Sequence, residues 1–395
     1  MIVVSNIFAL EGVNINYSFC IIIMNKKFYN SLQILRVLAM TGIYLFHQGL
    51  ADELFSRWGV CVFFVLSGFL SIYSRYDRVQ PVSVIDCIRS GLMRIRHIFP
   101  LHVVMLLAAF VMQIAGRTGN LIPGSPDIGI QTCIKFLLNL FLLSDWIPHT
   151  DLLRGINGEY NIVTWFLSAT LLFYMITPPV IDIMRRIYSD KNHARPVIVV
   201  LSILAFTITI NLCFIYLMGE VGSFWYIYES PLSRIGDYLI GAQLGYICLS
   251  KRATGTGNGY KPAMHIVIPA AAIILNIVFI CIGLTPQFYK YKYLVSSGFY
   301  FTIPVCMLIM AAVWMESEDH CRAEKPQPMA LRGVYLLGDL SSYIFLIHYP
   351  VITGIHGVLK RLGTDNIALW SMASVVLTLV LTVLWDMLFK KICEG

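Results

Sequence analysis

The sequence predicts an all-α, polytopic integral membrane protein: a helical bundle of about ten transmembrane helices with both termini in the cytoplasm. The first observation is composition, because 57% of the 395 residues are hydrophobic and only 13% are charged, against about 25% charged in soluble domains. The second is that the apolar residues form long unbroken runs, whereas a β-barrel would show weakly alternating segments of about ten residues. The third is the distribution of basic residues between these runs.

Ten segments have the length and apolar character that a helix needs to cross the hydrocarbon core. An eleventh apolar segment, 134–147, is short, contains Asn139 and ends in Ser144-Asp145-Trp146. The ten predicted spans are residues 30–49, 55–74, 98–115, 161–182, 197–218, 230–250, 263–284, 294–315, 334–356 and 367–389.

Lysine and arginine are concentrated in alternate loops, with 19 on one side and 8 on the other. Cytoplasmic loops have the excess of these residues, so both ends are predicted to be cytoplasmic and the number of crossings to be even. This parity favours a segment 134–147 that dips into the membrane or lies along its outer surface. The alternative is a short span with a shifted neighbouring boundary. The net charge of +7 needs no nucleic-acid partner to explain it.

Residues 1–24 form an N-terminal extension of uncertain character, and residues 25–395 form one transmembrane domain without a soluble domain. Glu11, Asn14 and Asn16 interrupt the apolar extension, which does not resemble a signal peptide. Ten cysteines are scattered without a CxxC pair or a Cys/His cluster. The sequence therefore predicts neither a metal site nor a disulfide framework.

The first span contains two ionisable residues, Arg36 and His47, and such residues in membranes tend to mark function. They are 11 positions apart, so they lie on one helix face about 16 Å from each other along the axis. The alternative is that Arg36 extends to the headgroups and His47 ends an interfacial helix.

Other predicted spans and their flanks also contain polar residues. Arg94, Arg96 and His97 precede Pro100 and would attract phosphate, from anionic lipid or from a phosphorylated ligand. Arg234 and Asp237 are three positions apart on one helix and can form a structural ion pair. Three further features are the small residues Ser67 and Gly68, which permit close helix contact, the run from Trp165 to Tyr174, and a second intramembrane histidine, His348.

In this order, these segments resemble the membrane-bound acyltransferase family 3, which includes bacterial O-acetyltransferases of surface polysaccharides and other glycans. Each segment is weak evidence singly, and the ordered set is specific. The matching segments are Arg36 to His47, Phe63 to Phe69, the basic residues before Pro100, Trp165 to Pro178, Arg234 to Gly241 and Ser342 to His348.

The resemblance implies an O-acyltransferase in the inner membrane of a bacterial cell. It implies acyl-CoA, usually acetyl-CoA, as a co-substrate used from the cytoplasmic side, with no permanently bound cofactor. The acceptor would be a hydroxyl of a glycan or a lipid-linked sugar. Membrane lipids and a second copy of the chain in a homo-oligomer are further expected partners.

The resemblance also assigns roles to residues. His47 would be catalytic together with Arg36, either as the base that deprotonates the acceptor hydroxyl or as the carrier of the acyl group. Arg94, Arg96 and His97 would bind the phosphates of the donor. The residues expected to contact substrate or to support these motifs are Ser67, Trp165, Tyr174, Arg234, Asp237 and His348.

The sequence departs from the family pattern at two positions. Many members have an acidic residue five positions after the tryptophan, where this chain has Thr170. Glu159, Asp237 or water are the substitutes considered for its role. The family also usually places arginine three residues before the proline, where this chain has His97, so donor contacts are expected to shift by one residue.

Two other classes of function fit part of the sequence. A transporter or flippase for a polysaccharide unit would account for the topology and for some of the intramembrane charges. It would not account for a basic cluster at the same membrane face as Arg36. A non-catalytic or sensory relative would account for Thr170. Binding or hydrolysis of acetyl-CoA by purified protein separates these classes.

Overall fold

The computed structural model describes residues 30–76, 82–118, 130–147, 156, 160–188, 195–253, 264–289, 291, 299–319, 329–364 and 366–394. Within these ranges the regular structure is entirely helical, which confirms the predicted fold class at this level. The predicted extension 1–24 and Glu159 lie outside the described residues.

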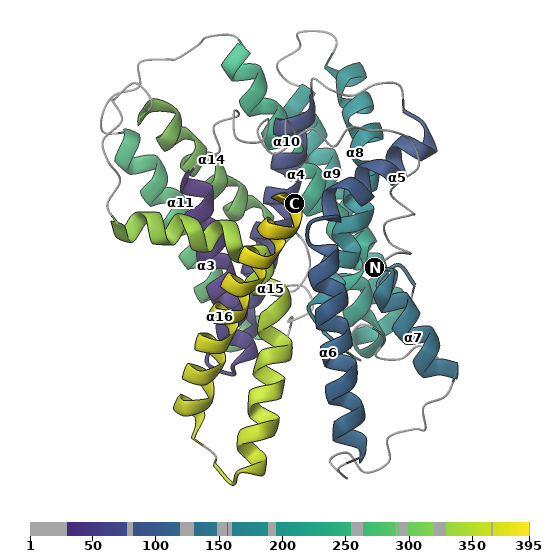
Figure 1. Ribbon diagram of the computed structural model, residues 1–395. Coiled ribbons are helices and arrows are strands. Elements are labelled where there is room, and N and C mark those ends of the chain that lie inside the picture. The colour runs from purple at the N-terminus through teal and green to yellow at the C-terminus, as the bar shows by residue number, and fades with distance from the viewer. Residues whose placement is uncertain are drawn as a thin grey trace.

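The helices follow the predicted spans closely (Figure 1). Their bounds are α3 Asn30–His47, α4 Glu53–Arg75, α5 Val84–Ile95, α6 Phe99–Thr118, α7 Ile130–Leu140, α8 Thr164–Ile187, α9 Arg195–Phe224, the π-helical turn η2 Trp225–Glu229, α10 Pro231–Ala253, α11 Met264–Gly283, α12 Pro286–Tyr289, α14 Thr302–Asp319, α15 Met329–Arg361 and α16 Ile367–Glu394.

Six of the described helices are long and apolar enough to cross a membrane: α4, α8, α9, α11, α15 and α16. The pair α5 and α6 would make a seventh, with a bend of 68° at its break. These helices support a multi-pass membrane protein. The predicted count of ten crossings and the orientation of the termini stay predictions.

Helix α7 covers the first half of the short apolar segment predicted at 134–147. It has 11 residues, so it is about 16 Å long, roughly half the thickness of the hydrocarbon core. The chain then turns at Leu142, a non-glycine residue with a φ of 57°. This turn leads to Asp145, which is completely buried inside the bundle.

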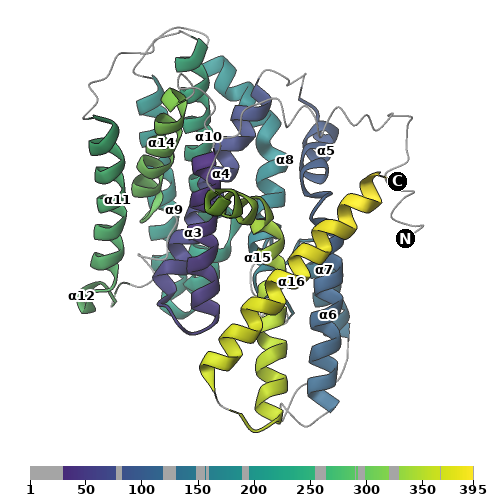
Figure 2. The same ribbon diagram turned by 60° about the vertical axis from the view of Figure 1, so that its left-hand side comes forward.

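Helices α11 and α16 lie at the outside of the bundle, whereas α4 lies among α3, α8 and α10 (Figure 2). Helix α4 is largely buried and packs against α3 and α10, while α15 packs against α3 and α16. Helices α9, α11 and α16 expose most of their apolar surface. In a membrane protein such a surface faces lipid, because lipid tails solvate apolar side chains.

Glycines bring α4 and α10 into direct backbone contact. A Cβ atom on Gly68 would lie 1.9 Å from the carbonyl oxygen of Tyr238, and one on Gly241 would lie 2.0 Å from that of Val65. No larger residue fits at either position without moving a helix. The prediction that Gly68 permits close helix contact is therefore confirmed.

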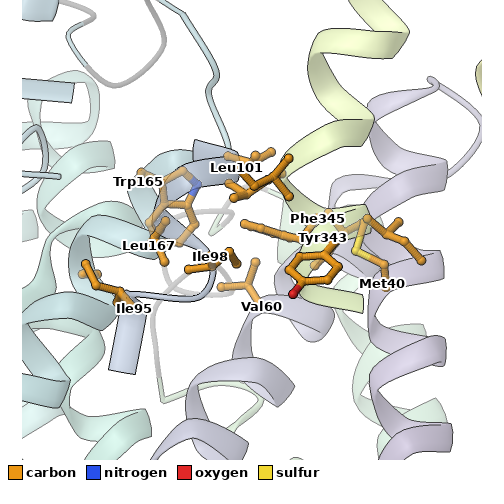
Figure 3. Close-up of a cluster of buried hydrophobic side chains, with 14 of the residues drawn as sticks. Met40, Val60, Ile95, Ile98, Leu101, Trp165, Leu167, Tyr343 and Phe345 are labelled. Carbon is orange, nitrogen blue, oxygen red and sulfur yellow. The ribbon is translucent and has the colours of Figure 1, made fainter. Parts of the chain in front are cut away.

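A large cluster of buried apolar side chains joins α3, α4, α5, α6, α8 and α15 (Figure 3). Met40 from α3, Trp165 from α8 and Phe345 from α15 all belong to it. Because interiors pack closely in defined rotamers, this cluster fixes α3 relative to α15. That matters because each of these two helices contains one of the intramembrane histidines.

Candidate active site

His47 at the end of α3 and His348 in α15 form a hydrogen-bonded pair. Their Nδ1 and Nε2 atoms, respectively, are 2.9 Å apart, although the residues are 301 positions apart in the chain. His348 is completely buried. The rings of Tyr44 and Tyr349 flank the pair, with centroids 5.7 Å from His348 and 5.3 Å from His47.

The hydrogen bonds of His348 assign the protons of this pair when both rings are neutral. Its Nδ1 lies 2.8 Å from the carbonyl oxygen of Phe345 and 3.2 Å from that of Ile344. A carbonyl oxygen only accepts, so Nδ1 holds the proton and Nε2 of His348 has the lone pair. His47 must then donate through Nδ1, which leaves a lone pair at Nε2 of His47.

Pro350 explains a neighbouring contact of α15. Proline has no N–H group, so the carbonyl of Leu346 lacks its usual helical donor. Asn161, just before α8, donates its Nδ2 to that carbonyl at 3.0 Å. The sequence His348-Tyr349-Pro350 therefore leaves an open carbonyl within one turn of the histidine, and Asn161 connects α8 to this turn.

Arg36 belongs to a different part of α3 and contacts other residues. Its guanidinium donates to Gln33 Oε1 at 3.1 Å, and Gln33 Nε2 donates to Asp339 Oδ1 of α15 at 2.6 Å. Arg36 also lies within electrostatic range of Asp339 and Tyr174. It is therefore connected to both α15 and α8.

The three predicted donor-binding residues do not point the same way. Arg94 faces inward: it donates to Ser71 Oγ, and its guanidinium lies 4.5 Å from the centre of the Tyr174 ring. Arg96 and His97 are exposed in the turn between α5 and α6. Tyr174 thus contacts Arg94 and also lies within electrostatic range of Arg36.

Ser67 lies one turn from Ser71 on α4. The Oγ atom of Ser71 donates to the carbonyl of Ser67 at 2.5 Å. Ser67 is therefore placed next to the residue that Arg94 contacts. Its predicted role in supporting substrate stays a prediction.

The predicted pair of Arg234 and Asp237 is confirmed as a buried ion pair. The two groups are 3.2 Å apart, and each residue is only 1% exposed. Thr302 Oγ1 donates to Asp237 at 2.5 Å, and Arg234 donates its Nε–H to the carbonyl of Tyr228 at 2.7 Å. Trp165 extends this cluster, with its ring 5.1 Å from that of Tyr228.

Thr170 uses its hydroxyl in a local hydrogen bond, which it donates to the carbonyl of Phe166 at 2.7 Å. Two other buried polar residues, Asn161 and Asp145, were not predicted as parts of the site. Asp145 was visible only as the polar end of a short apolar segment. The contacts of these two residues form only when distant segments pack together. The one signal for Asp145 in the sequence was a charged residue in an apolar segment.

The arrangement provides a base or nucleophile at His47 Nε2, with its orientation and tautomer fixed by His348. The basic residues before Pro100 provide an inward arginine, Arg94, and two exposed residues, Arg96 and His97. An aromatic series joins the histidine pair to the buried ion pair, through ring contacts of Phe345 with Phe166 and of Trp165 with Tyr228. Such a site can remove a proton from a neutral hydroxyl or accept an acyl group.

Comparisons with known proteins agree on one family. The family model for the acyltransferase domain, Acyl_transf_3, matches residues 29–387. The O-acetyltransferase OatA of Staphylococcus aureus (strain NCTC 8325 / PS 47) is 22% identical over 338 residues, covering 83% of this chain and 51% of the relative. No solved structure matches.

Two other relatives extend this result. The peptidoglycan O-acetyltransferase OatA of Listeria monocytogenes serovar 1/2a is 19% identical over 335 residues, covering 83% of this chain and 50% of the relative. The acyltransferase MdmB of Streptomyces mycarofaciens is 31% identical over 128 residues, covering 32% of this chain and 29% of the relative. The chain thus spans about half the length of the OatA relatives that it matches.

Proposed function

The chain belongs to the acyltransferase 3 family, and on that premise we propose that it is a membrane O-acetyltransferase that transfers acetyl from acetyl-CoA to a hydroxyl of a sugar-containing acceptor. The observation that supports this most directly is the hydrogen bond between His47 and His348. It leaves a lone pair on His47 Nε2, as acyl transfer to a hydroxyl requires.

As a base, His47 Nε2 takes the proton of the acceptor hydroxyl while the hydroxyl oxygen attacks the thioester carbonyl. The C–S bond then breaks, and the CoA thiolate leaves with the proton that His47 had taken. As a nucleophile, Nε2 would instead attack the thioester carbonyl, and the C–S bond would break to leave an acyl-imidazole and the CoA thiolate. The acceptor hydroxyl would then attack this acyl group, the N–C bond would break, and the hydroxyl proton would go to the thiolate. Trapping an acetylated enzyme with labelled acetyl-CoA, in the absence of acceptor, distinguishes the two routes.

The donor reaches His47 from the other end of α3. Arg96 and His97 are exposed and suited to bind the phosphates of CoA. Arg94 and Arg36, both near Tyr174, mark the route of the acyl-pantetheine arm into the bundle. Cysteine crosslinking tests this route, which requires that Arg94 and His47 border one continuous path.

The topology completes the proposal. The chain crosses the inner membrane of a bacterial cell ten times with both ends in the cytoplasm, because the basic loops alternate along the sequence. Helix α3 then runs outward, so Arg36 faces the donor side and His47 faces the side of the acceptor. Membrane lipids surround α9, α11 and α16, and a homo-oligomer is an expected assembly.

The names of the relatives support one class of acceptor. Two of them are named O-acetyltransferases, and one of these a peptidoglycan O-acetyltransferase. The proposed acceptor of this chain is a cell-surface glycan or its lipid-linked precursor. The exact acceptor of the relatives is not transferred, because this chain spans about half of their length. Glycan mass spectrometry of wild-type and deletion cells would detect the loss of an acetyl mass.

The direct test is acetyl transfer by the purified protein, with triacetylchitotriose as a soluble acceptor. His47→Ala should abolish transfer in a protein that still folds, with a slightly lower thermal stability because His348 loses its hydrogen-bond donor. His348→Ala should lower kcat about 100-fold, in the range for loss of assisted proton transfer. His348→Gln should recover part of the rate, because its carbonyl oxygen can accept the proton that His47 donates through Nδ1.

Each other class of function predicts a different result. Full transfer by His47→Ala would contradict the assigned mechanism. A transporter would bind the glycan without hydrolysing acetyl-CoA, and a non-catalytic relative would cause no acetylation defect when deleted.

A further inference from the structure

Asp145 has a buried carboxylate oxygen without a partner among the described residues. The residue is completely buried, and Ser144 Oγ donates to its Oδ2 at 2.9 Å, while Oδ1 has no hydrogen bond. Its backbone N–H is held by Ser168 Oγ of α8 at 3.3 Å, and Ser168 in turn donates to the carbonyl of Leu142 at 2.7 Å. The carboxylate is therefore fixed in place, with one acceptor oxygen unused.

Asn161 has a second oxygen of the same kind. Its amide orientation is settled, because Nδ2 must be the atom that donates to the carbonyl of Leu346. The backbone carbonyl of Asn161 accepts from the N–H and from the Oγ1 of Thr164, at 3.0 and 2.8 Å. The remaining atom, Oδ1, is buried and has no partner among the described residues.

Hydrogen bonds and short stretches of α8 and α15 connect both residues to the histidine pair. Leu346, which Asn161 contacts, is next in sequence to Phe345, whose carbonyl accepts from His348. Thr164, which holds Asn161, lies one turn from Ser168, which holds Asp145. One end of α8 therefore positions both oxygens and connects them to the helix that orients His47.

The chemistry of these two atoms indicates what they bind. Both oxygens can accept hydrogen bonds, and a buried acceptor without a donor is destabilising. The two arginines beside the Tyr228 ring are already engaged, Arg57 with Glu53 at 2.8 Å and Arg234 with Asp237 at 3.2 Å. Glu229 adds a second carboxylate within electrostatic range of Asp145, which disfavours an anionic ligand.

Aromatic side chains adjoin these acceptors. Trp146 donates its Nε1–H to the carbonyl of Ser168 at 3.0 Å, and Trp165 of the same helix α8 packs against Tyr228. Apolar aromatic faces combined with acceptor oxygens suit a neutral polyol, which has both C–H surface and several O–H donors. Phosphate has the opposite requirement, because its oxygens need donors.

We propose that Asp145 Oδ1 and Asn161 Oδ1 accept hydrogen bonds from hydroxyl groups of the sugar acceptor and so position it against His47. This inference rests on the proposed acetyl-transfer function and adds the residues that recognise the acceptor. Neither residue is among those that the sequence singled out for the site.

The sharpest variant is Asp145→Asn, which keeps the size of the side chain. Its amide oxygen can still accept from Ser144, so its NH2 group replaces the unused acceptor by a donor. The KM for triacetylchitotriose should rise about tenfold, as expected when a buried hydrogen bond to the acceptor is lost. The KM for acetyl-CoA should stay the same. Asn161→Ala should shift the acceptor KM in the same direction.

A matched control is Asn211→Ala. Asn211 of α9 is also buried, also has an unpartnered Oδ1, and donates its Nδ2 to the carbonyl of Thr207 at 2.8 Å in its own helix. Its variant should leave the acceptor KM unchanged. Thermal unfolding of all variants, with their KM for acetyl-CoA, identifies any variant that is merely misfolded.

The outcomes separate this inference from the proposed function. An active wild-type protein whose Asp145→Asn variant folds and keeps the acceptor KM would overturn the inference alone. An equal rise of KM in Asn211→Ala would also overturn it, because the effect would not be specific to the site. A wild-type protein that folds and transfers no acetyl group from acetyl-CoA would overturn the proposed function and this inference with it.

Discussion

Arg234 is a cation buried far from water, and several neighbours together replace its hydration. Asp237 supplies the counter-charge, Tyr228 supplies a carbonyl acceptor, and the Tyr228 ring lies 4.6 Å from the guanidinium. Breaking a buried ion pair on one side leaves an uncompensated charge, which is much more costly than the loss of an exposed pair. Arg234 therefore depends on Asp237 for the stability of this end of the bundle.

Removal of Asp237 should measure that dependence. Asp237→Ala should lower the free energy of unfolding by about 3–5 kcal/mol, and a second change of Arg234→Met should restore part of it. The control is Asp182→Ala, because Asp182 pairs with Arg186, which is 79% exposed, and such pairs contribute about 0–1 kcal/mol. Denaturant unfolding in detergent gives both values. Equal losses at Asp237 and Asp182 would contradict the argument.

The separation of partners along the chain explains which residue contacts the sequence could predict. Arg234 and Asp237 are three positions apart, so helix geometry alone predicted their pairing. The two histidines were recognised one by one, but their 301-residue separation hid the contact between them. Asp145 was hidden for the same reason, because its environment is created by Ser168 and Glu229 from other elements.

At the scale of elements, the contact between α4 and α10 depends on the absence of side chains. Gly68 and Gly241 each face a carbonyl oxygen of the opposite helix. In lipid, where helix association relies on close packing instead of the hydrophobic effect, small residues at such crossings are essential. This contact positions the Arg234 cluster of α10 against the aromatic residues of α4.

A methyl group at this crossing should be strongly destabilising. Gly68→Ala should lower the free energy of unfolding by about 1–3 kcal/mol, the usual cost of overpacking, and should lower the melting temperature in detergent. Gly357→Ala is the control, because a Cβ atom there would have nothing within 4 Å. Its unfolding temperature should be unchanged or slightly higher, since alanine favours helix. A stable Gly68→Ala protein would show that the helices can separate at little cost.

Element boundaries were largely predictable, and their exceptions have physical reasons. Long apolar runs fix helices such as α4 and α16, because lipid requires each spanning segment to satisfy its own backbone. Hydropathy could not foresee that the basic segment before Pro100 forms a separate helix, α5, bent by 68° from α6. It also could not foresee the left-handed turn at Leu142, since leucine rarely adopts that conformation.

For the whole molecule, the alternation of basic loops predicts a fixed orientation. A reporter inserted after Ser83, between α4 and α5, should behave as cytoplasmic. The same reporter after Thr364, between α15 and α16, should behave as external. Green fluorescent protein and alkaline phosphatase fusions measure the two locations. The same signal at both positions would contradict the predicted topology.

The poorly buried outer helices α9, α11 and α16 have a consequence for how this protein changes in evolution. Tyr216, Ile266 and Met387 are more than half exposed, and lipid places few demands on the shape of an apolar side chain. Exchanges among leucine, isoleucine, valine and phenylalanine at such positions should therefore be nearly neutral. Relatives should diverge fastest on these three helices, and a comparison of many family members should find its most variable apolar columns there.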